Sequence, residues 1–118
     1  MPFDPRDFYD VGLFLLPDVP GLEREALDRT AVGRFYYACP LAIRRHQRSQ
    51  GVRTSTFGSV LLALDASPQL AGLSVDLDEL HRLRNRADYD DANEFGHDRF
   101  DEALRLAERI QARLSLGW

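Results

Sequence analysis

Apolar residues recur at helical spacing along nearly the whole chain, and no segment alternates apolar and polar residues as a half-buried strand would. The clearest run lies between residues 27 and 42, where apolar side chains follow one another at intervals of three and four: Leu27, Ala31, Phe35, Ala38 and Ala42. Such a stripe covers one face of a helix and needs other elements to bury it. The periodicity therefore predicts an all-α protein.

A short first helix is expected behind Asp7, before the long stripe begins. Its buried face is predicted to carry Phe8, Val11 and Leu15, which recur at helical spacing. The turn-forming residues 17–21 (PDVPG) then end it.

The long helix that carries the stripe is expected to end at Gly51. Pro40 lies in its middle, removes one backbone hydrogen bond and crowds the preceding turn. We therefore expect a bend near Tyr36.

Three further helices are expected in the second half of the chain. Hydroxyl residues 54–56 (TST) are typical of a helix start, residues 67–68 and Gly72 of a turn, and Asp98 of another start. Short connections favour packing between sequential neighbours, which predicts an antiparallel bundle of four to five helices. The apolar faces expected for these helices are, in order, Phe57, Val60, Leu61 and Leu64; Leu77, Leu80, Leu83 and Ala87; and Phe100, Ala103, Leu104, Ala107, Ile110 and Leu114.

Length and composition describe an ordinary globular protein. The 118 residues fit a single domain, 1–118, and the 44% hydrophobic content suits one core. The apolar run at residues 11–16 is too short to span a membrane and lacks the basic start of a signal peptide. The single cysteine, Cys39, is expected to be a small core residue, as in a reducing compartment. These features predict a cytoplasmic protein without a membrane segment.

Charge and motif content limit the possible ligands. The net charge is −4, so any contact with RNA must be local, although all 15 basic residues are arginines, whose planar side chains suit phosphate. There is no glycine-rich phosphate loop, and one cysteine cannot form a cysteine cluster for a metal. No cofactor and no metal are expected.

The polar segment at residues 81–90 (HRLRNRADYD) is the main candidate for a site. Arg84 and Asp88 are one helical turn apart and can pair at the edge of the apolar stripe, while Asn85 and Tyr89 lie further round the helix. From the residues alone, two interpretations stay open: a solvated helix face with ion pairs, or a polar site at a groove.

This segment resembles the signature of the HEPN family (higher eukaryotes and prokaryotes nucleotide-binding), in its small stand-alone prokaryotic form. Residues 77–90 (LDELHRLRNRADYD) carry the likeness to an Arg-Asn-x-Ala-Asp-Tyr motif. Residues 26–38 (ALDRTAVGRFYYA) are similar to an Arg-x-Tyr-Tyr-Ala run on an early helix of that family. With a weaker match in the closing segment, the resemblance covers about residues 22–114.

The resemblance implies a helical bundle that forms a homodimer, with the polar motifs of both copies facing one cleft. In many HEPN proteins that cleft is a metal-independent ribonuclease site, in which an arginine stabilises charge on the phosphate and a following histidine transfers a proton. Counted from Arg84, that histidine would fall at positions 89–91, which are Tyr89, Asp90 and Asp91 here. Arg84 and Tyr89 are thus the candidate catalytic positions, without the histidine.

The same resemblance assigns four further residues to an RNA or partner cleft. They are Arg34, Tyr37, Asn85 and Asp88. From the residues alone, a tyrosine beside a core stripe is most often a packing residue with a solvated hydroxyl, so both interpretations of Tyr37 stay open.

The three histidines are expected to be surface or packing residues. His81 precedes Arg84 and His97 follows a loop, so only tertiary folding could bring either one to the cleft. His46 lies in residues 44–48 (RRHQR), which suit the end of a helix by complementing its dipole; a phosphate-contacting patch is the alternative.

Two functional hypotheses follow. In the first, the chain is a HEPN module of a toxin–antitoxin or defence system that acts by association, with a minimal nucleotidyltransferase as a candidate partner protein. Its catalysis is weak or absent, because a tyrosine, whose reference pKa is about 10, is a poor proton shuttle at neutral pH. In the second, the chain is a metal-independent endoribonuclease that uses Arg84.

Overall fold

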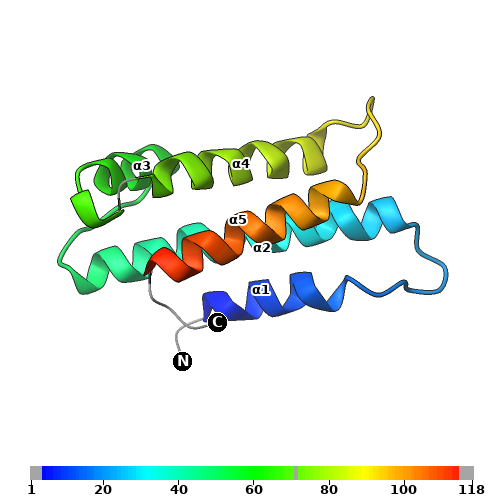
Figure 1. Cartoon of the computed structure of the whole chain (residues 1–118), viewed down its shortest axis with the longest axis horizontal. Helices are drawn as coiled ribbons and strands as arrows, with labels where there is room; N and C mark the ends of the chain where they lie inside the picture. The colour runs from blue at the N-terminus through cyan, green and yellow to red at the C-terminus, as the bar shows by residue number, and fades with distance from the viewer. Residues whose placement is uncertain (1–3, 71, 115–118) are drawn as a thin grey trace.

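The computed structural model describes residues 4–70 and 72–114, and in these residues five α-helices, one short 3₁₀ helix and no strand are found (Figure 1). The prediction of an all-α protein is therefore confirmed. None of the helices in this part of the chain combines the length and apolar character that crossing a membrane requires. The elements are α1 (Pro5–Phe14), α2 (Arg24–Ser49), α3 (Phe57–Asp65), η1 (Pro68–Leu70), α4 (Leu73–Tyr89) and α5 (Asp98–Leu114).

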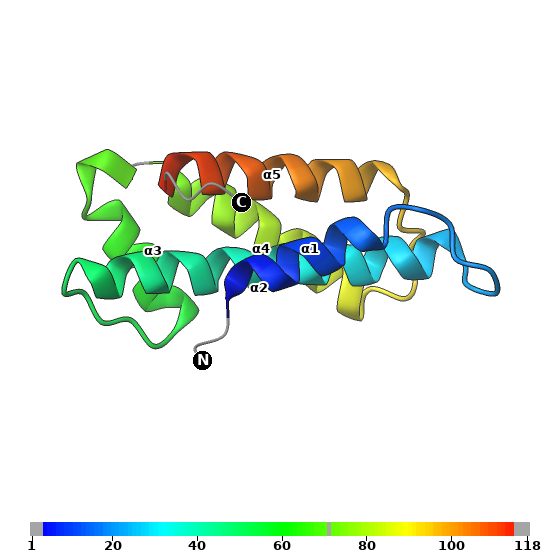
Figure 2. The same cartoon turned by 90° about the horizontal axis from the view of Figure 1, so that it is seen from below.

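The long helix α2 is the centre of the bundle. It packs against α1, α4 and α5, and α4 packs against α5. Figures 1 and 2 show that α1 and α4 run antiparallel to α2, whereas α5 runs antiparallel to α4. The short helices α3 and η1 lie at the end of the bundle where α2 finishes. This is the antiparallel bundle that the sequence predicts.

The apolar stripe of α2 is buried along its whole length. Every residue predicted for it is 3% exposed or less, and Cys39 is fully buried as well. Burial raises the pKa of the Cys39 thiol far above its ordinary value, which fits a packing residue. The helix continues through Pro40 without a break, so the bend near Tyr36 stays a prediction.

The prediction for α1 needs two corrections. Asp4 caps the helix, three residues before the expected Asp7. Val11 was expected on the buried face, but its side chain is 46% exposed, and Gly12 is buried in its place. The physical reason is close packing: a Cβ atom on Gly12 would lie 2.5 Å from Cε1 of Phe35, so only glycine lets α1 approach α2 here.

The second half of the chain follows the predicted pattern, with one shift in α5. Thr56 caps α3, and its hydroxyl and that of Ser59 form a capping box with the backbone of the first turn. In α5, Leu104 is only partly buried and Leu106 is buried instead. Leu106 follows Ala103 by three residues and therefore shares its face, whereas Leu104 lies about 100° away from it.

Candidate functional site

Arg84 is the centre of the candidate site and connects α4 with α2. Its Nη2 donates a hydrogen bond to the Tyr37 hydroxyl at 2.7 Å, and its Nη1 donates to Oδ1 of Asn85 at 3.1 Å. Its Nε lies 3.1 Å from Oδ2 of Asp88, but the N–H is not aligned for a hydrogen bond, so this contact is an ion pair only. The side chain of Arg84 is 18% exposed. It is held in place, yet one side of it still reaches the surface.

Tyrosine rings surround the guanidinium group of Arg84. Its central carbon lies 5.4 Å from the ring centre of Tyr37, 5.5 Å from that of Tyr89 and 5.7 Å from that of Tyr36. These distances suit cation–π attraction. Tyr36 is buried, whereas Tyr89 is 72% exposed. Tyr89 therefore offers an aromatic ring at the surface beside a charged group.

Arg34 extends this site along α2 towards α1. Its guanidinium carbon lies 5.5 Å from the ring centre of Tyr37 and 5.3 Å from that of Phe8. Its buried Nε has no hydrogen-bond partner among the described residues. The six residues predicted for the site thus form one connected group, which we call the Arg84 surface. Its members are Arg34, Tyr37, Arg84, Asn85, Asp88 and Tyr89.

Sequence reasoning missed the contributions of Phe8 and Tyr36 to this group. Phe8 was assigned only to the buried face of α1, and its contact with Arg34 depends on how α1 packs against α2. Tyr36 is next to Tyr37 in the sequence, and this position was the available indication that its ring lies near the site. Each ring packs against an arginine, Phe8 against Arg34 and Tyr36 against Arg84.

The Arg84 surface keeps a positive charge at neutral pH. It contains two arginines and one carboxylate, Asp88. Partial burial is the largest single influence on the pKa of Arg84 and lowers it. The hydrogen bond with Tyr37 and the electrostatic interactions with Tyr37, Tyr89 and Asp88 together outweigh burial, so the pKa of Arg84 is raised. A cation beside an exposed aromatic ring can bind an anion, a second aromatic group or a protein partner.

His81 lies close to this surface through the ring of Tyr36. The His81 ring stacks on Phe57, with ring centres 4.2 Å apart, and its centre lies 5.3 Å from that of Tyr36. Burial, followed by the charge of Arg84, lowers the pKa of His81, so this ring is neutral at pH 7. His81 and Arg84 lie three positions apart on α4, so helical spacing, and not tertiary folding as expected from the sequence, brings this histidine next to the arginine.

His97 belongs instead to a second polar cluster, at the start of α2, which the sequence did not predict. The fully buried carboxylate of Asp28 accepts a hydrogen bond from Nε of Arg24 at 2.9 Å and lies 2.8 Å from Nδ1 of His97. Arg24 also donates to the carbonyl oxygens of Leu15 and Leu16, each at 2.6 Å. Arg24 thus satisfies carbonyls at the C-terminal end of α1.

Arg29 binds backbone carbonyls at the C-terminal end of α4, as Arg24 does at the end of α1. It donates to the carbonyl oxygens of Arg86 and Ala87, both at 3.0 Å, and of Asn93 at 2.9 Å. Glu25 pairs with Arg29 and accepts the backbone N–H of Phe95, and that N–H, followed by Arg29, lowers the pKa of Glu25. We call this cluster the polar clamp. It consists of Arg24, Glu25, Asp28, Arg29 and His97.

Comparison with known proteins gives no match to a family model, to a curated protein or to a solved structure. In the described part of the chain, no group of three His, Cys, Asp or Glu side chains lies close enough together to hold a metal ion. The function of the site must therefore be argued from the residues and their geometry.

Proposed function

We propose that this chain is a HEPN-type helical module of a toxin–antitoxin or defence system, and that it acts by association. The observation that carries the proposal is the Arg84 surface, where the arginine fork of α4 is held by Tyr37 of α2 and lies beside the exposed ring of Tyr89. The likeness of residues 77–90 and 26–38 to the family's motifs supports the family, since both segments contribute to this one surface.

A second copy of the chain is the proposed first partner. Tyrosine and arginine are the residue types that most often dominate binding energy at interfaces, and they do so when partly desolvated and held in place. Arg84 is held by Tyr37 before any partner arrives, so little side-chain entropy is lost on binding. The same patch on two copies can meet across a two-fold axis.

Weak or absent nuclease activity is part of the proposal. The position that would carry the histidine is Tyr89, and the fork of Arg84 is already occupied by Tyr37 and Asn85. A phosphate would have to compete with these contacts. The further partners we propose are a minimal nucleotidyltransferase and RNA, bound without efficient cleavage.

Light scattering on the purified chain tests the proposal. We expect a dimer at micromolar concentration, and we expect Tyr89→Ala to shift it to monomer. Leu62→Ala is the matched control, because Leu62 on α3 is 73% exposed, against 72% for Tyr89. A monomeric wild type, or equal loss of dimer in both variants, would contradict association through the Arg84 surface.

A metal-independent endoribonuclease is the second candidate, and the place of His81 favours it. A neutral His81 could accept the proton of an RNA 2′-hydroxyl as that oxygen attacks the adjacent phosphorus, while Arg84 stabilises the charge on the phosphate oxygens. The bond from phosphorus to the 5′-oxygen then breaks, which leaves a 2′,3′-cyclic phosphate, and the 5′-oxygen takes a proton from water. Wild type, Arg84→Ala and His81→Ala would be incubated with single-stranded RNA without added metal. Cleavage that both variants lose would replace the first proposal with this one; intact RNA with all three would exclude it.

A further inference from the structure

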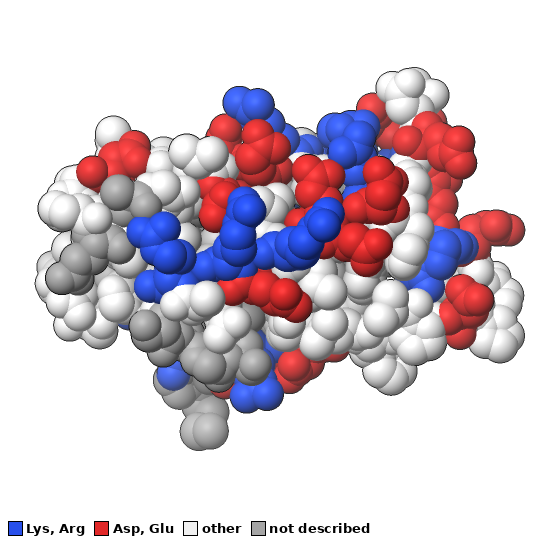
Figure 3. All heavy atoms as spheres, in the orientation of Figure 1, with Lys and Arg blue, Asp and Glu red and all other residues white. Residues whose placement is uncertain are grey.

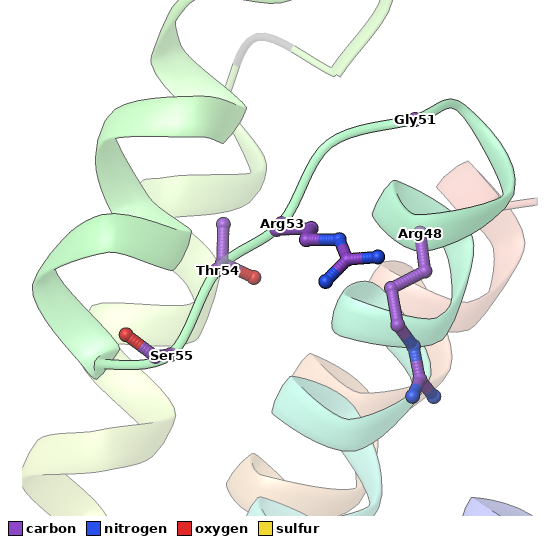
Figure 4. Close-up of a pocket in the computed structure, with 5 residues that line it drawn as sticks. All are labelled: Arg48, Gly51, Arg53, Thr54 and Ser55. Atoms are coloured by element: carbon purple, nitrogen blue, oxygen red, sulfur yellow. The ribbon is translucent and has the colours of Figure 1, made fainter.

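The last turn of α2 and the loop before α3 surround an open hollow of about 640 Å³. Figure 4 shows the guanidinium group of Arg53 directed across it towards the side chain of Arg48. Gly51 makes this approach possible, because its φ of +78° reverses the chain directly after the helix. The lining residues are Arg48, Gly51, Arg53, Thr54 and Ser55.

The loop that carries Arg53 is fixed by hydrogen bonds on both sides of that residue. The carbonyl of the buried Gln47 accepts the N–H of Val52 at 2.8 Å, and its side-chain oxygen accepts the hydroxyl of Thr54 at 2.9 Å. Nε of Arg44 donates to the carbonyl of Thr54 at 3.1 Å. The backbone at Arg53 is therefore set before any ligand binds.

The hollow has two positive charges and no carboxylate among its lining residues. Neither Arg48 nor Arg53 forms an ion pair within the described residues. The sequence explains this, because residues 29–64 contain six arginines and no Asp or Glu, although the whole chain has a net charge of −4. Positive charge is concentrated in one segment of an acidic protein.

Many arginines elsewhere in the described residues form ion pairs with Asp or Glu. The face in Figure 3 shows arginines interspersed with carboxylates. Arg109 on α5, for example, donates to Asp76 at 2.6 Å, and Arg99 donates to Glu102 at 2.9 Å. The unbalanced pair at the hollow is thus a local feature and not a property of the surface in general.

We propose that this Arg48–Arg53 hollow binds a phosphate group. Two guanidinium groups can each donate two parallel N–H bonds to phosphate oxygens, and an anion between them removes their mutual repulsion. The two arginines carry the binding, because the Thr54 hydroxyl already donates to Gln47 and the Ser55 hydroxyl points away from them in Figure 4. This site does not depend on the proposed function of the Arg84 surface.

The phosphate could belong to a small free anion or to an RNA backbone. Tyr37 and Arg48 are eleven residues apart, which is three helical turns, so both lie on the same side of α2 about 16 Å from each other. An extended RNA strand along α2 would reach the hollow and the Arg84 surface together. The two sources can be separated by experiment.

The test compares inorganic phosphate with a labelled single-stranded RNA of about 12 nucleotides. The variant is the double change Arg48→Gln and Arg53→Gln. Its matched control, Arg82→Gln with Arg105→Gln, removes the same charge from exposed positions on α4 and α5. Phosphate should shift the NMR signals of the Gly51 and Ser55 amides in wild type and control, but not in the hollow variant.

RNA binding, measured by anisotropy, should weaken about tenfold in the hollow variant, with its salt slope reduced by about 1.4, since each phosphate contact with a single strand contributes about 0.7. The control should lose less than about threefold. If phosphate shifts the amide signals but RNA does not bind, the site belongs to a small anion. If RNA binds to the wild type but not to the hollow variant, and phosphate shifts no signals, the site belongs to the RNA backbone. No binding of either probe by wild type, or equal loss in both double variants, would overturn the proposal. Arg84→Ala should keep the phosphate shifts even if the Arg84 surface has another role.

Discussion

The polar clamp and the Arg84 surface both depend on arginines that join one helix to another, but the acceptors differ. In the clamp, Arg24 and Arg29 donate to five backbone carbonyls, four at the ends of α1 and α4 and one, that of Asn93, in the loop before α5. They also pair with the carboxylates of Asp28 and Glu25. At the Arg84 surface, the neighbours of the guanidinium group are mostly tyrosine rings.

The type of acceptor distinguishes an arginine that stabilises the fold from one that can bind a partner. The last carbonyls of a helix have no partner in the next turn of that helix, so an arginine that binds them stabilises the fold. Tyrosine hydroxyls can be satisfied by water, so losing Arg84 leaves few groups unpaired. The clamp should therefore control stability, and the Arg84 surface should control binding.

The largest effect is expected from removing the buried carboxylate of the clamp. Asp28→Ala leaves Arg24 and His97 without their common partner, and we expect a loss of about 3 kcal/mol in the free energy of unfolding. Asp28→Asn keeps an acceptor oxygen and should lose less. Asp88→Ala, at the more exposed ion pair of Arg84, should cost less than about 1 kcal/mol. Urea unfolding followed by circular dichroism would measure all three, and equal losses for Asp28→Ala and Asp88→Ala would remove the distinction between the two regions.

The next effect compares the two arginines directly. Arg29→Ala removes one donor from the carbonyl oxygens of Arg86, Ala87 and Asn93, of which that of Arg86 keeps a second donor, the N–H of Asp90. This loss should cost about 2 kcal/mol of stability, whereas Arg84→Ala should cost about 1 kcal/mol or less. Dimer formation should show the reverse order, with the larger loss in Arg84→Ala. Melting curves and light scattering on the same two samples would report both quantities. A larger stability loss in Arg84→Ala would mean that the Arg84 surface is part of the structural frame.

The smallest effect concerns the titration of His81. Burial and then Arg84 lower its pKa in the folded state, so the folded protein favours the neutral ring. This contribution to stability is therefore complete above the ordinary pKa of histidine near 6.5 and is lost as the pH falls from there towards the lowered value. Arg84→Gln should raise the pKa of His81, as seen by NMR titration of its ring protons. Arg86→Gln, on the same helix, is the control, and an equal change there would show that His81 senses only the general charge of α4.

Periodicity was enough to predict the helices because burial of one face leaves a repeating pattern in the sequence. The exceptions have local reasons: the packing of α1 on Phe35 excludes any side chain at Gly12, and this displaced Val11 from the expected face. Such close approaches depend on the partner helix, which no pattern within α1 encodes.

The pairing of Arg84 with Asp88 was predictable because both residues lie on one helix, four positions apart. Its hydrogen bond with Tyr37 joins residues 47 positions apart and was indicated only by the family resemblance. The contacts of the polar clamp were even less predictable, because Arg29 binds carbonyls 57 to 64 residues away and a backbone carbonyl leaves no pattern in the sequence. The pairs Arg24 with Asp28 and Glu25 with Arg29 did have helical spacing, which was the available hint.

Cysteine cross-linking tests most directly whether the Arg84 surface is the contact between two copies. Asp88→Cys places a thiol at that surface and keeps Tyr89, and Glu102→Cys places one on α5 at a position of equal exposure, 35% against 36%; the native Cys39 is fully buried and should not react. With a short bismaleimide at micromolar protein concentration, we expect covalent dimers to form rapidly from Asp88→Cys and slowly from Glu102→Cys. Equal rates, or faster cross-linking through Glu102→Cys, would contradict an interface at the Arg84 surface.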